Sequence, residues 1–422
     1  MKNLLRATLI LAGLSLTIFA FTLLTLETIK LDIDIRESLI PFLAELSAGA
    51  FLLFLGISPS KIWKFKYAVM TFFAIMASIT IYFYSGANIF NLTPKDYVPE
   101  IYVWGDDFDP YNKKEYMNLY KRFNVKRVVH FAESDCNELS KSFKLVNLYR
   151  KNGIDFIICV WFSDFVAASN SSRLLETWKA FKGFYLDHRQ DFGTGFYVAI
   201  DSEPPNRFFI KKRNARDKGG LIEECRFMLK GFDRKRQALG ASNVRKFVDD
   251  AKSIGLRPML IAMPIVLDDQ LFGGNTLQTL YDMASIPPHN WDSFGYMIYR
   301  QDELPEEGYR TGNHFVYSYG RSIKKLHGDR SNILLGVADV GPYENIDEII
   351  KDVNIVKSLG IPMIGFFNLA RLTSIDGTRG LEKIFEAAKS PNTKSVDFCL
   401  KRKVTLVRHR NLAADIILSV LP

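Results

Sequence analysis

The chain has 422 residues, of which 48% are hydrophobic, and a formal net charge of +9. This length leaves room for one large domain and an appendage. Six scattered histidines without an H-x-H or H-E-x-x-H pattern, and four cysteines without zinc spacing, argue against a metal hydrolase, so we expect no metal and no cofactor.

Three long apolar runs crowd the N-terminal part of the chain, at 7–26, 39–57 and 67–84. Each is close to the ~20 residues that a helix needs to cross a bilayer. The first run is too long for a signal peptide and has no small-residue cleavage site near Leu24–Glu27. The sequence therefore predicts a membrane anchor of three transmembrane helices over 1–86.

Charged residues between these runs predict their orientation. Lys2 and Arg6 precede the first run, and Lys61, Lys64 and Lys66 separate the second from the third. The positive-inside rule then places the N-terminus in the cytoplasm and everything after the third run outside. We expect a multi-pass membrane protein whose outward-facing domain has no nucleic-acid partner.

A polar linker at 87–99 leads into a second region, 100–390, where short apolar runs alternate with amphipathic segments. Alternation of strand and helix predicts a parallel sheet, and eight repeats over about 290 residues are typical of an α/β fold, the (β/α)₈ TIM barrel. A doubly wound open sheet is the alternative, but its Gly-rich phosphate loop is absent. The predicted strands are 101–105, 127–132, 155–162, 195–201, 258–266, 294–299, 333–340 and 362–369. The predicted helices are 113–123, 136–151, 174–188, 242–254, 277–284, 309–326, 346–359 and 381–389.

The fourth predicted strand ends in two carboxylates, Asp201 and Glu203, followed by Pro204 and Pro205. Alternation along a strand places both acids on the same side, about 6.6 Å apart. The prolines end the strand because they cannot donate to the ladder. Paired acids at a strand end suit general acid/base chemistry, although a structural role, such as pairing with Arg207, is the alternative.

Active sites of TIM barrels lie at the C-terminal ends of the strands. In this chain those positions form a polar and aromatic ring, in which aromatic side chains would stack on the C–H faces of a sugar while carboxylates accept its hydroxyls. The members of this ring are Trp104, Asp106, Asp107, His130, Glu133, Trp161, Ser163, Asp164, Asp201, Glu203, Met263, Tyr299, Arg300, Asp339, Asn368 and Arg371.

Two strand-end motifs resemble those of retaining glycoside hydrolases that act on N-acetylhexosamine polymers. The motif Ile200-Asp201-Ser202-Glu203 resembles the fourth strand of the family 18 chitinase-like and hyaluronidase-like barrels. Met297-Ile298-Tyr299 resembles their sixth strand. The resemblance implies that Glu203 is the general acid/base, that Asp201 orients a substrate acetamido group acting as internal nucleophile, and that Tyr299 hydrogen-bonds this group.

The chain departs from that pattern at several positions. Phe196 and Ala199 occupy the two earlier acidic positions, Arg300 follows Tyr299 in place of an acid, and Asn368 stands where a tryptophan would form the floor of the site. An alternative retaining mechanism uses Glu203 as acid/base and Asp339, on the seventh strand, as a covalent nucleophile. We also list Trp104, Asp106, Trp161, Arg300 and Asn368 as candidate substrate-binding residues.

An insertion at 206–241 follows Glu203 directly and contains eleven Lys/Arg against four acids. Clustered cations attract polyanions, so an acidic glycan, a lipid-linked phosphate, an anionic membrane surface and plain solvent are all open interpretations. The basic tail at 391–422 either packs under the barrel or lies on the bilayer.

The sequence as a whole predicts a membrane-anchored, extracytoplasmic glycosidase that cleaves or remodels a cell-surface glycan, either acidic or containing N-acetylhexosamine. The competing hypothesis is a non-catalytic barrel, tethered to the membrane, that binds a glycan or a protein. The sugar, the linkage and the oligomeric state have no signal in the sequence.

Overall fold

The computed structural model describes residues 89–419, apart from 93–94, 96, 105–112, 133–135, 163, 285–289, 301–311, 337–342, 344, 392–395 and 400–401. The predicted anchor at 1–86 lies outside the described residues. Within the described part of the chain, no helix combines the length and the apolarity that crossing a bilayer requires.

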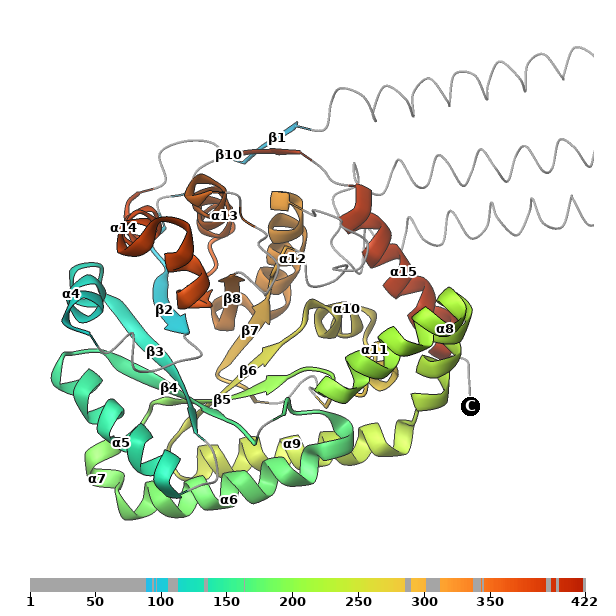
Figure 1. The fold of residues 1–422 in the computed structure, drawn as a ribbon, viewed down its shortest axis with the longest axis horizontal. Coiled ribbons are helices and arrows are strands. Elements are labelled where there is room, and N and C mark those ends of the chain that lie inside the picture. The colour runs from blue at the N-terminus through green and yellow to red at the C-terminus, as the bar shows by residue number, and fades with distance from the viewer. Residues whose placement is uncertain are drawn as a thin grey trace, which may run out of the picture. The chain divides into compact units, whose positions relative to one another are not determined.

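The central element is a closed barrel of eight parallel strands in the order β2-β3-β4-β5-β6-β7-β8-β9 (Figure 1). The ring closes where β2 pairs with β9, from Glu100 opposite Met363 to Trp104 opposite Phe367. This confirms the predicted barrel. Its strands are β2 (Glu100–Trp104), β3 (Val125–Ala132), β4 (Asp155–Val160), β5 (Tyr197–Ser202), β6 (Arg257–Ala262), β7 (Ser293–Met297), β8 (Ser331–Gly336) and β9 (Met363–Phe367).

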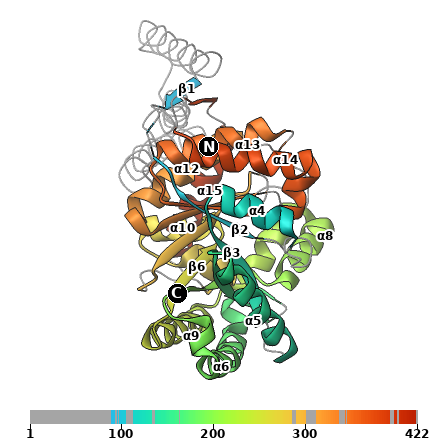
Figure 2. The ribbon, with the colours of Figure 1, turned by 90° about the vertical axis from the view of Figure 1, so that its left-hand side faces the viewer.

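Helices follow the strands and surround the barrel, with α6 and α9 side by side in both views (Figure 1, Figure 2). Their apolar faces pack on the sheet, which is how a parallel sheet buries both of its sides. They are α4 (Lys114–Arg122), α5 (Cys136–Lys151), α6 (Ser171–Asp187), α7 (Arg189–Phe192), α8 (Asn206–Gly231), α9 (Arg234–Ser253), α10 (Pro264–Phe272), α11 (Thr276–Leu280), α12 (Gly312–His327), α13 (Ile346–Ser358) and α14 (Leu369–Lys389), with short 3₁₀ helices at Ala168–Asn170 and Gly328–Arg330.

Every second residue of each strand points into the barrel, where these side chains form one packed cluster. At the N-terminal end, the guanidinium groups of Arg127 and Arg257 lie 4.9 and 4.2 Å from the ring centre of Tyr197. The interior is therefore a filled core. Its members are Tyr102, Trp104, Val129, Ile157, Cys159, Tyr197, Ala199, Met259, Ile261, Met297, Tyr299, Leu334 and Met363, with Phe131, Met263 and Phe367 against them.

The strand predicted over 258–266 is wrong beyond Ala262. Pro264 occupies the first turn of α10, where its missing N–H costs nothing, and Gly273 ends that helix in the left-handed conformation. The short apolar run thus contains a strand end and a helix start. In the same way, the basic insertion forms α8 and the first turns of α9, which Asp233 caps by accepting a hydrogen bond from the Arg236 amide.

A second unit of the chain comprises 1–91 and 397–410. Strands β1 (Ile89–Leu92) and β10 (Val396–Cys399) form a two-stranded sheet. Helix α15 (Arg402–Ser419) begins in this unit, and its last part, from Asn411 on, belongs to the barrel unit. There Asn411 donates to the Asp268 carboxylate on α10 over 2.8 Å.

The Tyr102 ring packs against Gly365 of β9, where no side chain stands in its way. A substitution at Gly365 tests this close packing. A β-carbon at Gly365 would lie 2.2 Å from Tyr102 Cζ, so Gly365→Ala should destabilise the protein by roughly 1–3 kcal/mol through overpacking. Gly183→Ala is the matched control, since nothing lies within 4 Å of its added methyl group, and it should stabilise α6 by about 0.5–1 kcal/mol. Urea unfolding measures both, and equal stability of Gly365→Ala and the native chain would contradict this packing.

Candidate active site

The two acids predicted as catalytic lie together at the C-terminal end of β5. Asp201 has the inward orientation of Tyr197 and Ala199, four and two residues earlier on the same strand. Its side chain is buried, while Glu203, just past the strand, is half-buried. The pair therefore presents one carboxyl group at the surface of the barrel mouth and one beneath it.

Burial controls the protonation of this pair. Desolvation raises the pKa of Asp201 to about 7, and a hydrogen bond with the Glu203 side chain offsets part of that rise. Asp201 Oδ1 is buried, and it accepts no hydrogen bond among the residues that the structure describes. Burial raises the pKa of the nearby Cys159 thiol, and the Asp201 carboxylate raises it further. Near neutral pH the two acids can thus hold one proton between them.

Neighbouring loops hold the end of β5 in place. The Val166 amide donates to the Asp201 carbonyl over 2.8 Å, and the Ser202 hydroxyl donates to the Val166 carbonyl over 3.3 Å. Asp164 Oδ1 accepts hydrogen bonds from the amides of Phe165, at 3.0 Å, and Asn206, at 3.1 Å. Asp164 therefore fixes the first residue of α8 next to Glu203.

An arc of aromatic rings continues from these acids around the mouth. Trp161 on the β4 side contacts Phe131 with ring centres 5.1 Å apart, and Phe131 contacts Trp104 at 5.3 Å. Trp104 meets Phe367 edge-on at 5.5 Å, and Phe367 stacks on Tyr299 at 5.5 Å. The arc thus runs over β4, β3, β2, β9 and β7. Such a surface suits the C–H faces of a sugar.

The predicted aromatic residues differ in their access to solvent. Trp104 is only 2% exposed and Tyr299 only 5%, so both form the floor of the arc, whereas Trp161 is half-buried. Sequence reasoning missed Phe131 and Phe367, which are half-buried and join the predicted rings into one surface. The alternation of side chains along β3 and β9 could have found them. Phe131 lies two residues after the inward Val129, and Phe367 lies four residues after the inward Met363, so both face the interior.

Arg300 lies at the end of β7 and makes its contacts with α13. Its Nε donates to Asp352 Oδ2 over 2.6 Å, and its Nη2 donates to the Glu348 carbonyl over 3.1 Å. The guanidinium lies 4.7 Å from the ring centre of Tyr343, whose hydroxyl donates to Asp352 over 2.9 Å. These contacts fasten the β7 end to α13, and a role of Arg300 in substrate binding stays a prediction.

The other predicted site residues lie at different places in the chain. Asn368 is buried and its carbonyl accepts the Leu372 amide over 3.0 Å in the first turn of α14. His130 alternates with the inward Val129 and Phe131, so it faces the helices, and burial lowers its pKa to about 3. Asp106, Asp107 and Asp339 lie outside the described residues.

The described part of the chain holds no group of three or more His, Cys, Asp or Glu side chains placed to share a metal ion. Of the cysteines with described side chains, Cys159 is buried and Cys225 is exposed, and both are free thiols. Acid/base chemistry by carboxyl groups is what this geometry offers.

No protein-family model matches the chain, and no curated protein matches it either. Among solved structures, the chain is similar to the PgaB (BpsB) glycoside hydrolase domain from Bordetella bronchiseptica, at 10% identity and a TM-score of 0.41, over 68% of this chain and 99% of that one. A GH18 chitinase from Pseudoalteromonas aurantia gives 10% identity and a TM-score of 0.40, over 68% and 99%. Aspergillus clavatus Sph3 in complex with GalNAc gives 12% and 0.39, over 70% and 98%. Likenesses this weak transfer no activity to the chain.

Replacing Asp201 tests the shared proton through stability. A carboxyl whose pKa rises on folding binds its proton more tightly in the folded state, so native stability should fall as pH rises from about 4 to about 7. Asp201→Asn removes this contribution, on the order of 2–4 kcal/mol across that range. Urea unfolding at both ends of the range measures it, with the exposed Asp187→Asn as control. Identical pH dependence in the native chain and Asp201→Asn would rule out the raised pKa.

Arg300 can be tested in the same way. Arg300→Met leaves the fully buried Asp352 without its ionic partner, which should cost about 3–5 kcal/mol of stability. The double variant Arg300→Met/Asp352→Asn should recover part of that loss, because it removes the unpaired charge. If Arg300→Met keeps native stability and only weakens substrate binding, the residue contacts substrate instead.

Proposed function

We propose that this protein is a glycoside hydrolase that cleaves or remodels a cell-surface glycan. The observation that supports it most is the hydrogen-bonded pair of Asp201 and Glu203 on an inward-facing strand end, with the Asp201 pKa raised to about 7. Glycosidases need one carboxyl group protonated and another ionised near neutral pH, and closely spaced acids provide this. The aromatic arc beside the pair supports a sugar as substrate.

Glu203 is the general acid/base in this proposal, because it is the more exposed member of the pair. It transfers its proton to the glycosidic oxygen as the bond to the leaving group breaks, and it later takes a proton from the water that attacks the anomeric carbon. Asp201 stays below it and holds the pair in the singly protonated form.

Resemblance to the chitinase-like barrels extends the proposal to amino sugars. In that mechanism the acetamido carbonyl oxygen of the substrate attacks the anomeric carbon while its N–H donates to Asp201, and Asp201 Oδ1 lacks a hydrogen-bond partner among the described residues. Tyr299 faces the same interior and would orient the group. The alternative route uses Asp339 as a covalent nucleophile. The two routes differ in the group that bonds to the anomeric carbon, which is either the acetamido oxygen of the substrate or the Asp339 carboxylate.

The proposed location is the outer face of a membrane, with residues 1–86 as a three-span anchor. It rests on the apolar runs at 7–26, 39–57 and 67–84 and on the lysines between the second and third. The barrel then meets its glycan outside the cytoplasm, which agrees with a cell-surface substrate.

A second candidate function is a barrel that binds a glycan without cleaving it. One observation favours it: the residue after Tyr299, where chitinase-like barrels carry an acid, is Arg300, and this side chain is held by α13. The end of β7 then contributes an aromatic ring and no carboxyl group among the described residues. Such a protein would hold its ligand on the same aromatic arc.

Glu203→Gln distinguishes the two functions. If Glu203 is the general acid, its loss should lower the release of reducing ends from chitin oligosaccharides or acidic glycans by at least ~10², the usual contribution of general acid catalysis. Glu176→Gln, an exposed acid on α6, is the control and should keep full activity. Unchanged turnover in Glu203→Gln removes the assignment. Glycan binding without product in the native chain identifies the binding module.

A further inference from the structure

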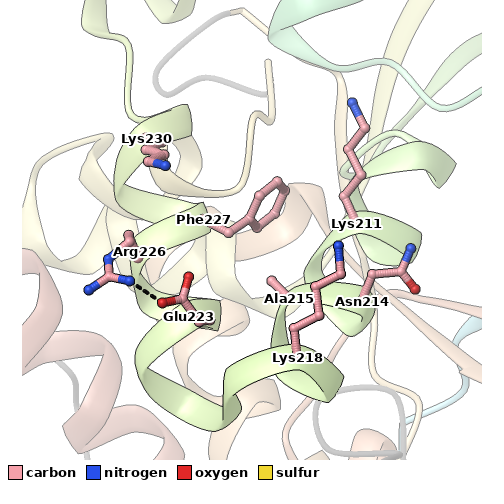
Figure 3. A pocket seen from close by; sticks show the side chains of 8 residues that line it. All are labelled: Lys211, Asn214, Ala215, Lys218, Glu223, Arg226, Phe227 and Lys230. Atoms are coloured by element: carbon pink, nitrogen blue, oxygen red, sulfur yellow. Dashed lines mark hydrogen bonds and ion pairs between the residues drawn. The ribbon is translucent and has the colours of Figure 1, made fainter.

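Helix α8 is a hairpin that extends from the active-site strand. Gly219 and Gly220 interrupt its helical geometry, and Gly220 adopts a φ of +63°, a conformation that favours glycine. One arm precedes these glycines and the other follows them, with a cavity of about 340 Å³ between the two (Figure 3). The insertion is therefore folded and has a defined outer surface.

The inner side of the hairpin is anchored to the barrel. Phe208 and Met228, one from each arm, are buried against Leu280 of α11 and Leu418 at the end of α15. The Phe208 ring lies 5.5 Å from Phe227 and 5.8 Å from Tyr281, measured between centres. This contact positions the outer side of the hairpin relative to the barrel mouth.

Most of the charged side chains that line the cavity between the two arms are basic. Lys211 and Lys218 on the first arm and Lys230 on the second line the cavity, are exposed, and pair with no acid among the described residues (Figure 3). Two neighbouring cations are already neutralised, since Lys212 and Arg216 lie 3.4 and 3.6 Å from the Glu224 carboxylate. Three lysines thus remain available to an anionic partner.

Large apolar side chains are exposed on the same hairpin. Ile222 is 72% exposed, Ile210 61% and Leu229 48%. Ile222 and Leu229 line an apolar hollow next to Lys230, together with Cys225. Exposed aliphatic side chains and lysines without an acidic partner among the described residues therefore lie on the same hairpin. Exposed apolar side chains that gather on one surface with polar residues around them mark protein or membrane interaction sites.

From this combination we infer that the α8 hairpin docks on an anionic phospholipid surface. Exposed aliphatic side chains gain by entering the interface between headgroups and acyl chains, while the lysines attract anionic headgroups. An acidic polysaccharide would match the lysines but offers nothing to Ile222 and Leu229, whose exposed side chains are aliphatic and not aromatic. Lipid is therefore the occupant that uses both features.

Docking has a consequence for the active site. Helix α8 begins at Asn206, three residues after Glu203, and Asp164 holds that start in place. The first arm is about 20 Å long at 1.5 Å per residue. A docked hairpin therefore keeps the barrel mouth near the lipid surface, where a surface glycan begins.

The exposed thiol of Cys225 provides the probe for the test. The full chain, with Cys136→Ser and Cys399→Ser, carries an environment-sensitive fluorophore on Cys225 and is incorporated into vesicles of phosphatidylcholine, with or without roughly 30% phosphatidylglycerol. Quenching by a spin-labelled lipid reports contact of the hairpin with the membrane, whether or not residues 1–86 anchor the chain. We expect quenching on anionic vesicles only, and a decrease as salt rises.

Two charge variants complete the test. Lys211→Gln/Lys218→Gln/Lys230→Gln should lower the docked-to-free ratio by roughly 10², about fivefold for each lysine. Lys121→Gln/Lys144→Gln/Lys179→Gln removes three exposed lysines from α4, α5 and α6 and should change nothing. Equal quenching on neutral and anionic vesicles overturns the inference. So does a probe response to soluble polygalacturonate that anionic vesicles fail to produce, because it identifies a glycan site instead.

Discussion

The hydrogen bond between Asp201 and Glu203 is the interaction on which the proposed chemistry depends. A buried carboxylate without a partner is costly, and the low-dielectric barrel interior around Asp201 therefore favours its protonated form. The half-buried Glu203 completes the pair at the solvent side. Two acids that hold one proton can donate it to a leaving group and recover it from water, which is the cycle a glycosidase requires.

The rest of the barrel maintains this geometry. Tyr102 crosses β9 at Gly365, and Arg127 and Arg257 close the opposite end over Tyr197, so the strands have little freedom to shift. Hydrogen bonds from Val166 and to Asp164 hold the loops on both sides of β5. On the far side of the mouth, α13 holds the end of β7 through the Asp352 carboxylate. The acids therefore lie in a preorganised frame, which the proposed catalysis would require.

Local patterns predicted the closed barrel and the shared side of its two strand-end acids. Alternation placed Asp201 and Glu203 on one side, and the strand–helix rhythm predicted the closed barrel. What failed depends on contacts between distant segments. The aromatic arc needs the register that brings Trp104 next to both Phe131 and Phe367, and a single strand does not contain this information. The apolar run through Pro264 predicts a strand where the chain forms α10, because a run of that length suits a strand or a buried helix equally. The contacts of Arg300 with α13 lie about 50 residues away in sequence and had no local signal.

Isotope-edited infrared titration of the carboxyl groups tests the shared proton most directly. The native protein should show one protonated carboxyl stretch that persists to about pH 7, and both Asp201→Asn and Glu203→Gln should alter it. A native protein in which both carboxyl groups are already ionised at about pH 5 would contradict the account, because neither acid would then hold the proton that cleavage requires.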